Sequence, residues 1–214
     1  MKQITAEGLK KAFDAFGYKI DTFQLVGIRS TADAPDKFDD LIGVFQFVDG
    51  KPIVNWFTGT TNPGVHWLKN FMNPKGTAVL MPGIYENCWV LGKHQGKYEA
   101  LVQYAPVTVF RDKNRNNKSE TRLFSKGGKE EVKPILDRGL FGINIHQANK
   151  KAISLIIDRW SAGCQVLNNP KEFAQLLQMC KKSGKKTFTY VLFEEAQVLK
   201  VLGVEVPIEK KLEA

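Results

Sequence analysis

Two segments in the second half of the chain contain the residue types that a cysteine enzyme needs. Phe141–His146 is a largely apolar run that ends in a histidine, and Trp160–Val166 holds a cysteine directly after a small Ser-Ala-Gly turn. Cysteine catalysis requires a base near the thiol, a group that orients the base, and N–H groups directed at the developing oxyanion. Gly163 can adopt a positive φ, which would let the backbone curl beside the sulfur. The pattern predicts Cys164 as nucleophile and His146 as its base.

The protonation state of this pair follows from the same hypothesis. A neighbouring imidazolium would lower the pKa of the Cys164 thiol and supply a thiolate near neutral pH. The alternative is that Cys164 is a small buried apolar residue and that His146 is a hydrogen-bonded core residue. The other two cysteines, Cys88 and Cys180, lie in strand and helix patterns, and we interpret both as structural.

The spacing and flanks of the pair favour the catalytic interpretation, because they resemble the L,D-transpeptidase (YkuD-type) family. That family's motif is a histidine, about fourteen to seventeen intervening residues, and then Ser/Thr-His-Gly-Cys. Here fourteen residues separate His146 from Ser161, and Ser161, Gly163 and Cys164 occupy the family's positions. Two departures stand out: Ala162 replaces the family's second histidine, and Gln165-Val166 follows the cysteine.

Upstream segments support the resemblance. Residues 43–54, followed by Thr58-Gly59-Thr60, look like the family's opening hairpin and its strand ending in Thr-Gly. Residues 73–77 resemble its Thr-Pro-x-Gly-x-Phe element. The likeness covers residues 40–193 and implies a catalytic domain there, preceded by a helix and leading strand in residues 1–39 and followed by a tail in residues 194–214.

The resemblance implies a mechanism on peptidoglycan stem peptides. Cys164 attacks the carbonyl of an L,D peptide bond, the terminal D-amino acid leaves with a proton from His146, and a thioester remains. Water or an amine then resolves the thioester. The N–H groups of Gly163 and Cys164 would hold the oxyanion, and the backbone carbonyl of Gln147 would orient the imidazole. Ser161 would help to shape the substrate site or would only cap the turn.

Two further residues are candidates for lining the substrate cleft. His94 lies in a glycine-flanked basic turn, Gly92–Lys97, that could reach the site. Trp160 directly precedes the Ser-Ala-Gly-Cys turn and would be either a wall of the cleft or part of the core.

A mainly β domain must position these residues. Runs rich in β-branched and aromatic residues predict strands, and Asp49-Gly50 predicts a hairpin turn. The predicted strands are 23–28, 42–48, 52–58, 78–80, 88–91, 100–104, 107–110, 142–145 and 187–193. Helical spacing predicts helices over 5–16 and 169–182, the second with Asn169 as cap and Pro170 at its first position. The resemblance specifies the class further, as a YkuD-like β-sandwich with an N-terminal helix and a helix after the catalytic cysteine.

Composition limits the classes of partner. The chain of 214 residues has a formal charge of +9, which favours anionic partners such as the polymers of a bacterial wall. No helix–turn–helix, zinc-finger or aromatic RNA-binding pattern accompanies the charge, so we expect no nucleic-acid partner.

Three cysteines and three histidines give little material for a metal site, and we expect no cofactor. Asp112, Asn114 and Asn116 alternate as at the start of a calcium loop, but the later ligands are out of register, so a solvated loop over residues 111–131 is the default.

No apolar stretch is long enough for a membrane span, and the first twenty residues show no secretion signal. We therefore expect a protein that is made in the cytoplasm and acts on the cell wall once released or exported. The leading hypothesis is a stem-peptide-cleaving cysteine peptidase, such as a bacteriolytic phage-type endolysin. The alternatives are an L,D-transpeptidase that forms or edits cross-links and a non-catalytic wall-binding module.

Overall fold

The computed structural model describes residues 4–32, 34–115, 117, 119 and 135–205. Across these residues the chain forms eleven strands and four helices, so the mainly β prediction is confirmed. The strands are β1 (Phe23–Arg29), β2 (Asp40–Val48), β3 (Lys51–Thr60), β4 (Thr77–Leu80), β5 (Gly83–His94), β6 (Tyr98–Gln103), β7 (Val107–Asp112), β8 (Ile135–Gly139), β9 (Ile145–Gln147), β10 (Gln165–Leu167) and β11 (Phe188–Glu194). The helices are α1 (Ala6–Ala15), α2 (Val65–Lys69), α3 (Pro170–Lys182) and α4 (Glu195–Val201).

Eight strands form one closed ring in the order β1-β11-β5-β6-β9-β10-β3-β2, and β2 pairs back onto β1. The other three form a separate sheet in the order β4-β7-β8. The sequence analysis expects two stacked sheets of a β-sandwich, whereas the hydrogen-bonded ladder here runs continuously around the barrel. The short strands β9 and β10 cause this difference, because they bridge β6 to β3.

Tight turns connect the long antiparallel strands. Asp49 and Gly50 both have positive φ, at 50° and 75°, and they join β2 to β3 as the sequence predicts. Gln95 and Gly96 have φ values of 50° and 71°, and they join β5 to β6. This second turn places His94 directly opposite Tyr98 at the end of the hairpin.

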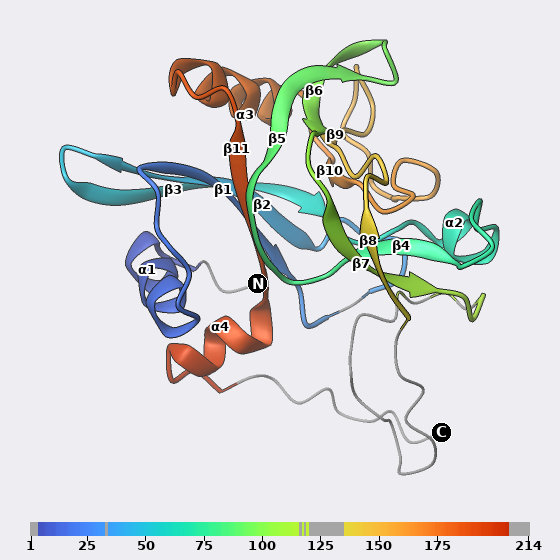
Figure 1. Cartoon of the computed structure of the whole chain (residues 1–214), viewed down its shortest axis with the longest axis horizontal. Coiled ribbons are helices and arrows are strands. Elements are labelled where there is room, and N and C mark those ends of the chain that lie inside the picture. Colours follow the sequence, from blue (N-terminus) through green and yellow to red (C-terminus); the bar gives the residue numbers. More distant parts are fainter. Residues whose placement is uncertain (1–3, 33, 116, 118, 120–134, 206–214) are drawn as a thin grey trace.

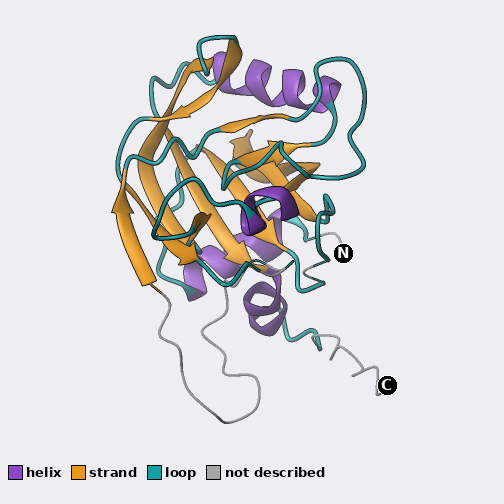
Figure 2. Cartoon of the chain, turned by 90° about the vertical axis from the view of Figure 1, so that its right-hand side faces the viewer, coloured by secondary structure: helices purple, strands orange, loops and turns teal. Residues whose placement is uncertain are grey.

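Apolar side chains form two clusters, one on each face of the long strands. The larger cluster includes Leu25, Trp89, Ile145 and Tyr190 and also takes the buried face of α3. The smaller lies between α1, α4 and the other face of β1, β2 and β11; its fully buried members include Leu9, Phe13, Val26, Phe45 and Val198. In Figures 1 and 2 α3 accordingly lies at the top of the strands, and α1 and α4 lie at the bottom.

The two predicted helices are confirmed, and their ends have the expected caps. The Thr5 side chain accepts a hydrogen bond from Gly8 N at the start of α1, and the Asn169 side chain accepts one from Lys171 N at the start of α3. Helices α2 and α4 and strands β8 and β10 were not predicted. Neither α2 nor α4 has a side-chain cap, and β10 is only three residues long.

One predicted strand is displaced. The sequence analysis expects a strand over residues 142–145, but β9 spans Ile145–Gln147. Side chains rather than a ladder hold the segment before it. Gln103 Oε1 accepts hydrogen bonds from Phe141 N and Ile143 N, and Trp89 Nε1 donates to Ile143 O.

Three predictions from the sequence remain: the absence of a membrane span, the loop over residues 111–131, and the domain boundaries. No helix of the described residues is long and apolar enough to cross a membrane. Most of the expected loop over residues 111–131, including Asn116, lies outside the described residues. The boundaries at residues 40 and 193 stay a prediction, although β1 pairs along its length with β2 and β11.

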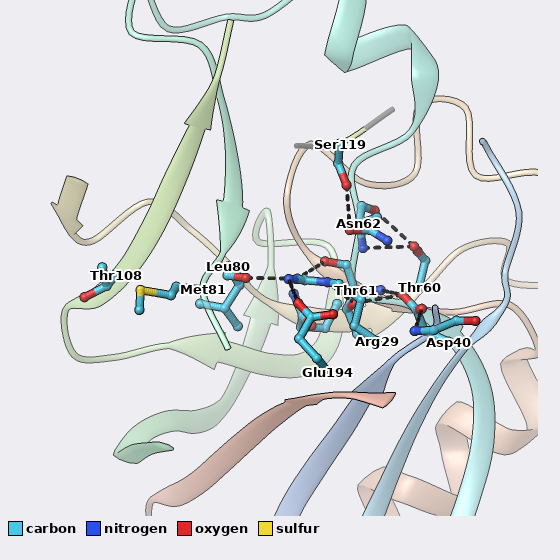
Figure 3. Close-up of polar contacts among 12 residues, drawn as sticks. Arg29, Asp40, Thr60, Thr61, Asn62, Leu80, Met81, Thr108, Ser119 and Glu194 are labelled. Atoms are coloured by element: carbon cyan, nitrogen blue, oxygen red, sulfur yellow. Dashed lines mark hydrogen bonds and ion pairs between the residues drawn. The ribbon is translucent and has the colours of Figure 1, made fainter. Parts of the chain in front are cut away.

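A buried arginine ties the ring to the small sheet. The guanidinium of Arg29 donates to Thr61 Oγ1, Thr61 O and Leu80 O at 2.9–3.0 Å, and its third nitrogen lies 3.4 Å from a Glu194 carboxylate oxygen (Figure 3). The carboxylate of Asp40 accepts from Thr61 N at 2.6 Å and from Thr61 Oγ1 at 2.8 Å. Burial raises the pKa of Asp40 to about 7. Thr61, directly after β3, is therefore held from two sides.

We expect Arg29→Met to lower the free energy of unfolding by about 3–5 kcal/mol, because it leaves the Thr61 and Leu80 carbonyls unpaired in the interior. Urea denaturation followed by circular dichroism measures this change. Arg138→Met is the matched control, since Arg138 is exposed on β8 and should change stability by less than about 0.5 kcal/mol. Equal effects of the two substitutions would contradict this role of Arg29.

Candidate active site

Parallel pairing of β9 with β10 brings the two predicted segments together. His146 pairs with Val166, Gln165 pairs with Ile145, and Gln165 N donates to Asn144 O at 2.9 Å. Residues opposite one another in a ladder point to the same face, and alternate residues share a face. His146 and Val166 therefore share a face of the sheet, and Cys164 directly precedes β10 with its sulfur against the backbone of residues 142–144.

The imidazole of His146 is held in one tautomer. Its Nδ1 lies 2.8 Å from Gln147 O, and because a carbonyl oxygen can only accept, Nδ1 carries the proton. Nε2 then has a lone pair. This atom is buried and has no hydrogen-bond partner among the described residues, and the whole side chain is only 2 % exposed. The structure thus places Gln147 where the resemblance implies an orienting carbonyl.

Tyr98 completes the support of this imidazole, and the sequence analysis did not identify it. The Tyr98 hydroxyl lies 3.1 Å from His146 Nδ1 and donates to Gln147 O at 3.2 Å. It can therefore accept from Nδ1–H while it donates to the same carbonyl. The sequence signal was the turn Gln95-Gly96, which places residue 98 opposite His94 at the end of the hairpin.

His94 lies against His146, and its role in lining a substrate cleft stays a prediction. The two rings stack with their centroids 4.0 Å apart and an angle of 25° between them. Asn144 fixes the tautomer of His94. Asn144 Oδ1 accepts from Gln103 N, so its Nδ2 donates to His94 Nδ1 at 3.0 Å, and that nitrogen is an acceptor. Asn144 is a second residue that the sequence analysis did not single out.

The Cys164 thiol is half-buried and hydrogen-bonded on both sides. Its sulfur accepts from Asn144 N at 3.4 Å and donates to Gly142 O at 3.3 Å. The thiol is thus not hydrogen-bonded to His146 Nε2. The preceding Gly163 has φ +123°, and a Cβ on it would lie 2.3 Å from Ala78 O, so both conformation and space require glycine there.

Ser161 shapes the turn before the cysteine. Its hydroxyl is fully buried, donates to Cys164 O at 2.8 Å and accepts from Gly163 N at 3.2 Å. The Gly163 N–H, one of the two expected oxyanion donors, is therefore already engaged. Gln165, one of the departures from the family motif, is also fully buried. Its Oε1 accepts a hydrogen bond from Tyr190 OH at 3.0 Å inside the barrel.

Trp160 lies at the edge of this arrangement. Its side chain is exposed, which excludes the core interpretation. Neither a ring contact nor a hydrogen bond joins its indole to the other described residues of the site. No group of three or more His, Cys, Asp or Glu side chains in the described part of the chain could hold a metal ion.

The protonation of the pair differs from the sequence expectation. Burial, helped by the adjacent His94, lowers the pKa of His146 to about 3. Burial also raises the pKa of the Cys164 thiol to about 11, although the hydrogen bond from Asn144 N opposes this. The predicted imidazolium–thiolate pair is therefore wrong for this structure. At neutral pH both the His146 imidazole and the Cys164 thiol are neutral.

Comparisons of the chain with protein families, with curated proteins and with solved structures found no match. The likeness to L,D-transpeptidases thus rests on the residues and spacing of the two segments described above.

We expect alkylation of Cys164 by iodoacetamide to be slow at pH 7 and to rise about tenfold per pH unit up to about pH 11. A pKa of about 11 leaves roughly 10⁻⁴ of the thiol ionised at pH 7. Mass spectrometry of labelled peptides gives the rate at each cysteine. Cys88 and Cys180, which are both buried, provide the internal controls and should react later. An inflection below pH 8 would show that the pair is ionic after all.

His94→Asn should raise the pKa of His146 by about 1 unit. The His94 imidazole disfavours a proton on His146, and the substitution removes it. The smaller asparagine side chain also admits water, so both changes raise the pKa of His146. Proton NMR titration of the ring signals measures this pKa, and only three histidines contribute. His66→Asn on α2 is the control and should leave it unchanged. A wild-type His146 that titrates near 6.5 would refute the prediction.

Proposed function

We propose that this protein is a cysteine peptidase of the L,D-transpeptidase type, which cleaves peptidoglycan stem peptides through a thioester on Cys164. One observation carries the proposal. The Nε2 atom of His146 is buried and has no hydrogen-bond partner in the described part of the chain, and the Gln147 carbonyl and the Tyr98 hydroxyl fix the tautomer of the ring. A buried imidazole nitrogen that serves only packing would normally be hydrogen-bonded.

The chemistry of the site begins from a neutral pair. As the Cys164 sulfur attacks a substrate carbonyl, the thiol gives up its hydrogen bond to Gly142 O. The thiol proton then moves to His146 Nε2. The imidazolium can still donate from Nδ1 to Gln147 O, which stabilises it. It then gives the Nε2 proton to the leaving amine, and water or another amine releases the acyl group. The N–H of Cys164 is the expected oxyanion donor that remains.

Two features favour stem peptides as substrates. The resemblance to L,D-transpeptidases implies which bond is cleaved, namely an L,D peptide bond at the third position of the stem. The formal charge of +9 favours a protein that accumulates on anionic wall polymers.

We also propose that the eight-stranded ring with its small sheet is a divergent form of the YkuD-like sandwich. Ala162 lacks the family's second imidazole, and His94 supplies a ring beside His146 from another strand.

The competing function is transpeptidation, which differs only in the group that resolves the thioester. We propose hydrolysis first and transpeptidation as the alternative. Incubation with an added D-amino acid separates the two. Hydrolysis shortens the muropeptide, whereas transpeptidation exchanges its terminal residue.

The decisive experiment uses defined tetrapeptide muropeptides and mass spectrometry. Cys164→Ala should reduce turnover by about 10³-fold or more, as expected for loss of a nucleophile. The matched control is Cys88→Ala, a cysteine outside the site, which should retain activity. Cys164→Ala should still sediment with purified sacculi at low salt, because charge rather than chemistry governs that step. Wild-type turnover by Cys164→Ala would refute the enzyme hypothesis.

A further inference from the structure

The segment between His146 and Cys164 presents an exposed apolar surface. Ile153, Leu155 and Ile156 are 56 %, 83 % and 59 % exposed, and Trp160, at the end of the same segment, is 42 % exposed. Monomeric proteins seldom leave so many large apolar side chains in one short loop facing water, and such patches mark interaction sites. We name residues 150–160 the apolar loop.

The backbone of the apolar loop is fixed although its side chains have no cover. Ser154 N donates to Asn168 O, Ile157 N donates to Asp36 O, and Trp67 Nε1 donates to Arg159 O, all at 3.0 Å. Ile157 is the one buried apolar residue of the loop and anchors it. Figure 1 shows the loop, in yellow to orange, standing out beside β10 on the side away from α1 and α4. The exposed side chains are thus presented on a rigid support.

Charge decides between the possible occupants of this surface. Lys151 and Arg159 are exposed in the loop, where Asp158 is the single acidic residue. Lys150 is also exposed, but its ammonium lies 5.1 Å from the centre of the Tyr98 ring. A second copy of the loop would bring like charges together. Aliphatic side chains also offer no stacking surface to nucleic acid bases. Aliphatic residues with a tryptophan and flanking lysine or arginine are the composition that suits a membrane interface with anionic headgroups.

We propose that the apolar loop docks this protein on the surface of an anionic lipid bilayer, with its aliphatic side chains among the acyl chains and its basic residues at the headgroups. This contact is peripheral and needs no membrane-spanning helix. It does not depend on the proposed catalysis. It would hold the candidate site close to the membrane, because the loop lies between His146 and Cys164 in the chain.

The test measures binding of the full chain to large unilamellar vesicles of phosphatidylglycerol and phosphatidylcholine in equal parts. The wild type should sediment with them and bind pure phosphatidylcholine more weakly. Leu155→Asp/Ile156→Asp should lower the partition coefficient at least about tenfold. Lys151→Gln/Arg159→Gln should lower it about five- to tenfold on the anionic vesicles. Circular dichroism checks that each variant is folded.

The matched control is Val48→Asp/Ile53→Asp on the β2–β3 hairpin. Val48 and Ile53 are 45 % and 36 % exposed, and the hairpin tip lies at the far left of Figure 1, away from the apolar loop. This variant adds the same charge and should bind as the wild type does, apart from a small general electrostatic loss.

A second measurement keeps the proposal testable if the double variant does not fold. Brominated lipids should quench part of the wild-type tryptophan fluorescence, and Trp160→Phe should abolish that quenching. Absence of vesicle binding, an equal loss in both aspartate variants, or quenching that persists in Trp160→Phe would each overturn the proposal. Dimerisation without lipid that Leu155→Asp/Ile156→Asp abolishes would instead assign the loop to self-association, and would also overturn it.

Discussion

The candidate site depends on the parallel pairing of two strands that are only three residues long. Strands β9 and β10 hold His146 and the Cys164 turn in register, and the same pairing closes the barrel. On either side the ladder is thin, with one residue pair to β6 and two pairs to β3. Arg29 and Asp40 therefore matter to the site, because they fix Thr61, which directly follows the residue paired with Val166.

The surroundings of the pair favour its uncharged form, so the proposed catalysis must start from a neutral thiol and a neutral imidazole. The hydrogen bond from Asn144 N favours a thiolate at Cys164, but burial of the sulfur outweighs it. The preparation lies in the base, whose free nitrogen, tautomer and orientation are fixed by Gln147 and Tyr98. His94 adds a stacked ring that opposes protonation of His146. In the proposed reaction, charge would develop only during attack on the substrate, and the buried surroundings would strengthen the hydrogen bonds to that charge.

Much of the fold could be predicted from the sequence where a local rule governs. Runs of β-branched and aromatic residues identified most long strands, and Asp49-Gly50 and the Asn169-Pro170 cap identified a turn and a helix start. The ring itself could not be predicted, since strands of three residues leave no periodic signal. In the site, His146, Cys164, Gly163 and Gln147 followed from spacing and resemblance. Tyr98 and Asn144 could not, because pairings between distant segments bring them there.

The hydrogen bond from the Cys164 thiol to the Gly142 carbonyl has a consequence for durability. Peroxide and disulfides react with the thiolate, so a sulfur that keeps its proton is a poor target for them. Many nucleophilic cysteines gain reactivity at the cost of rapid oxidation to sulfenic acid or mixed disulfides. Here the half-buried sulfur donates its proton to a carbonyl and is held in the thiol form. Such a thiol can persist in an oxidising medium without a reducing system to restore it.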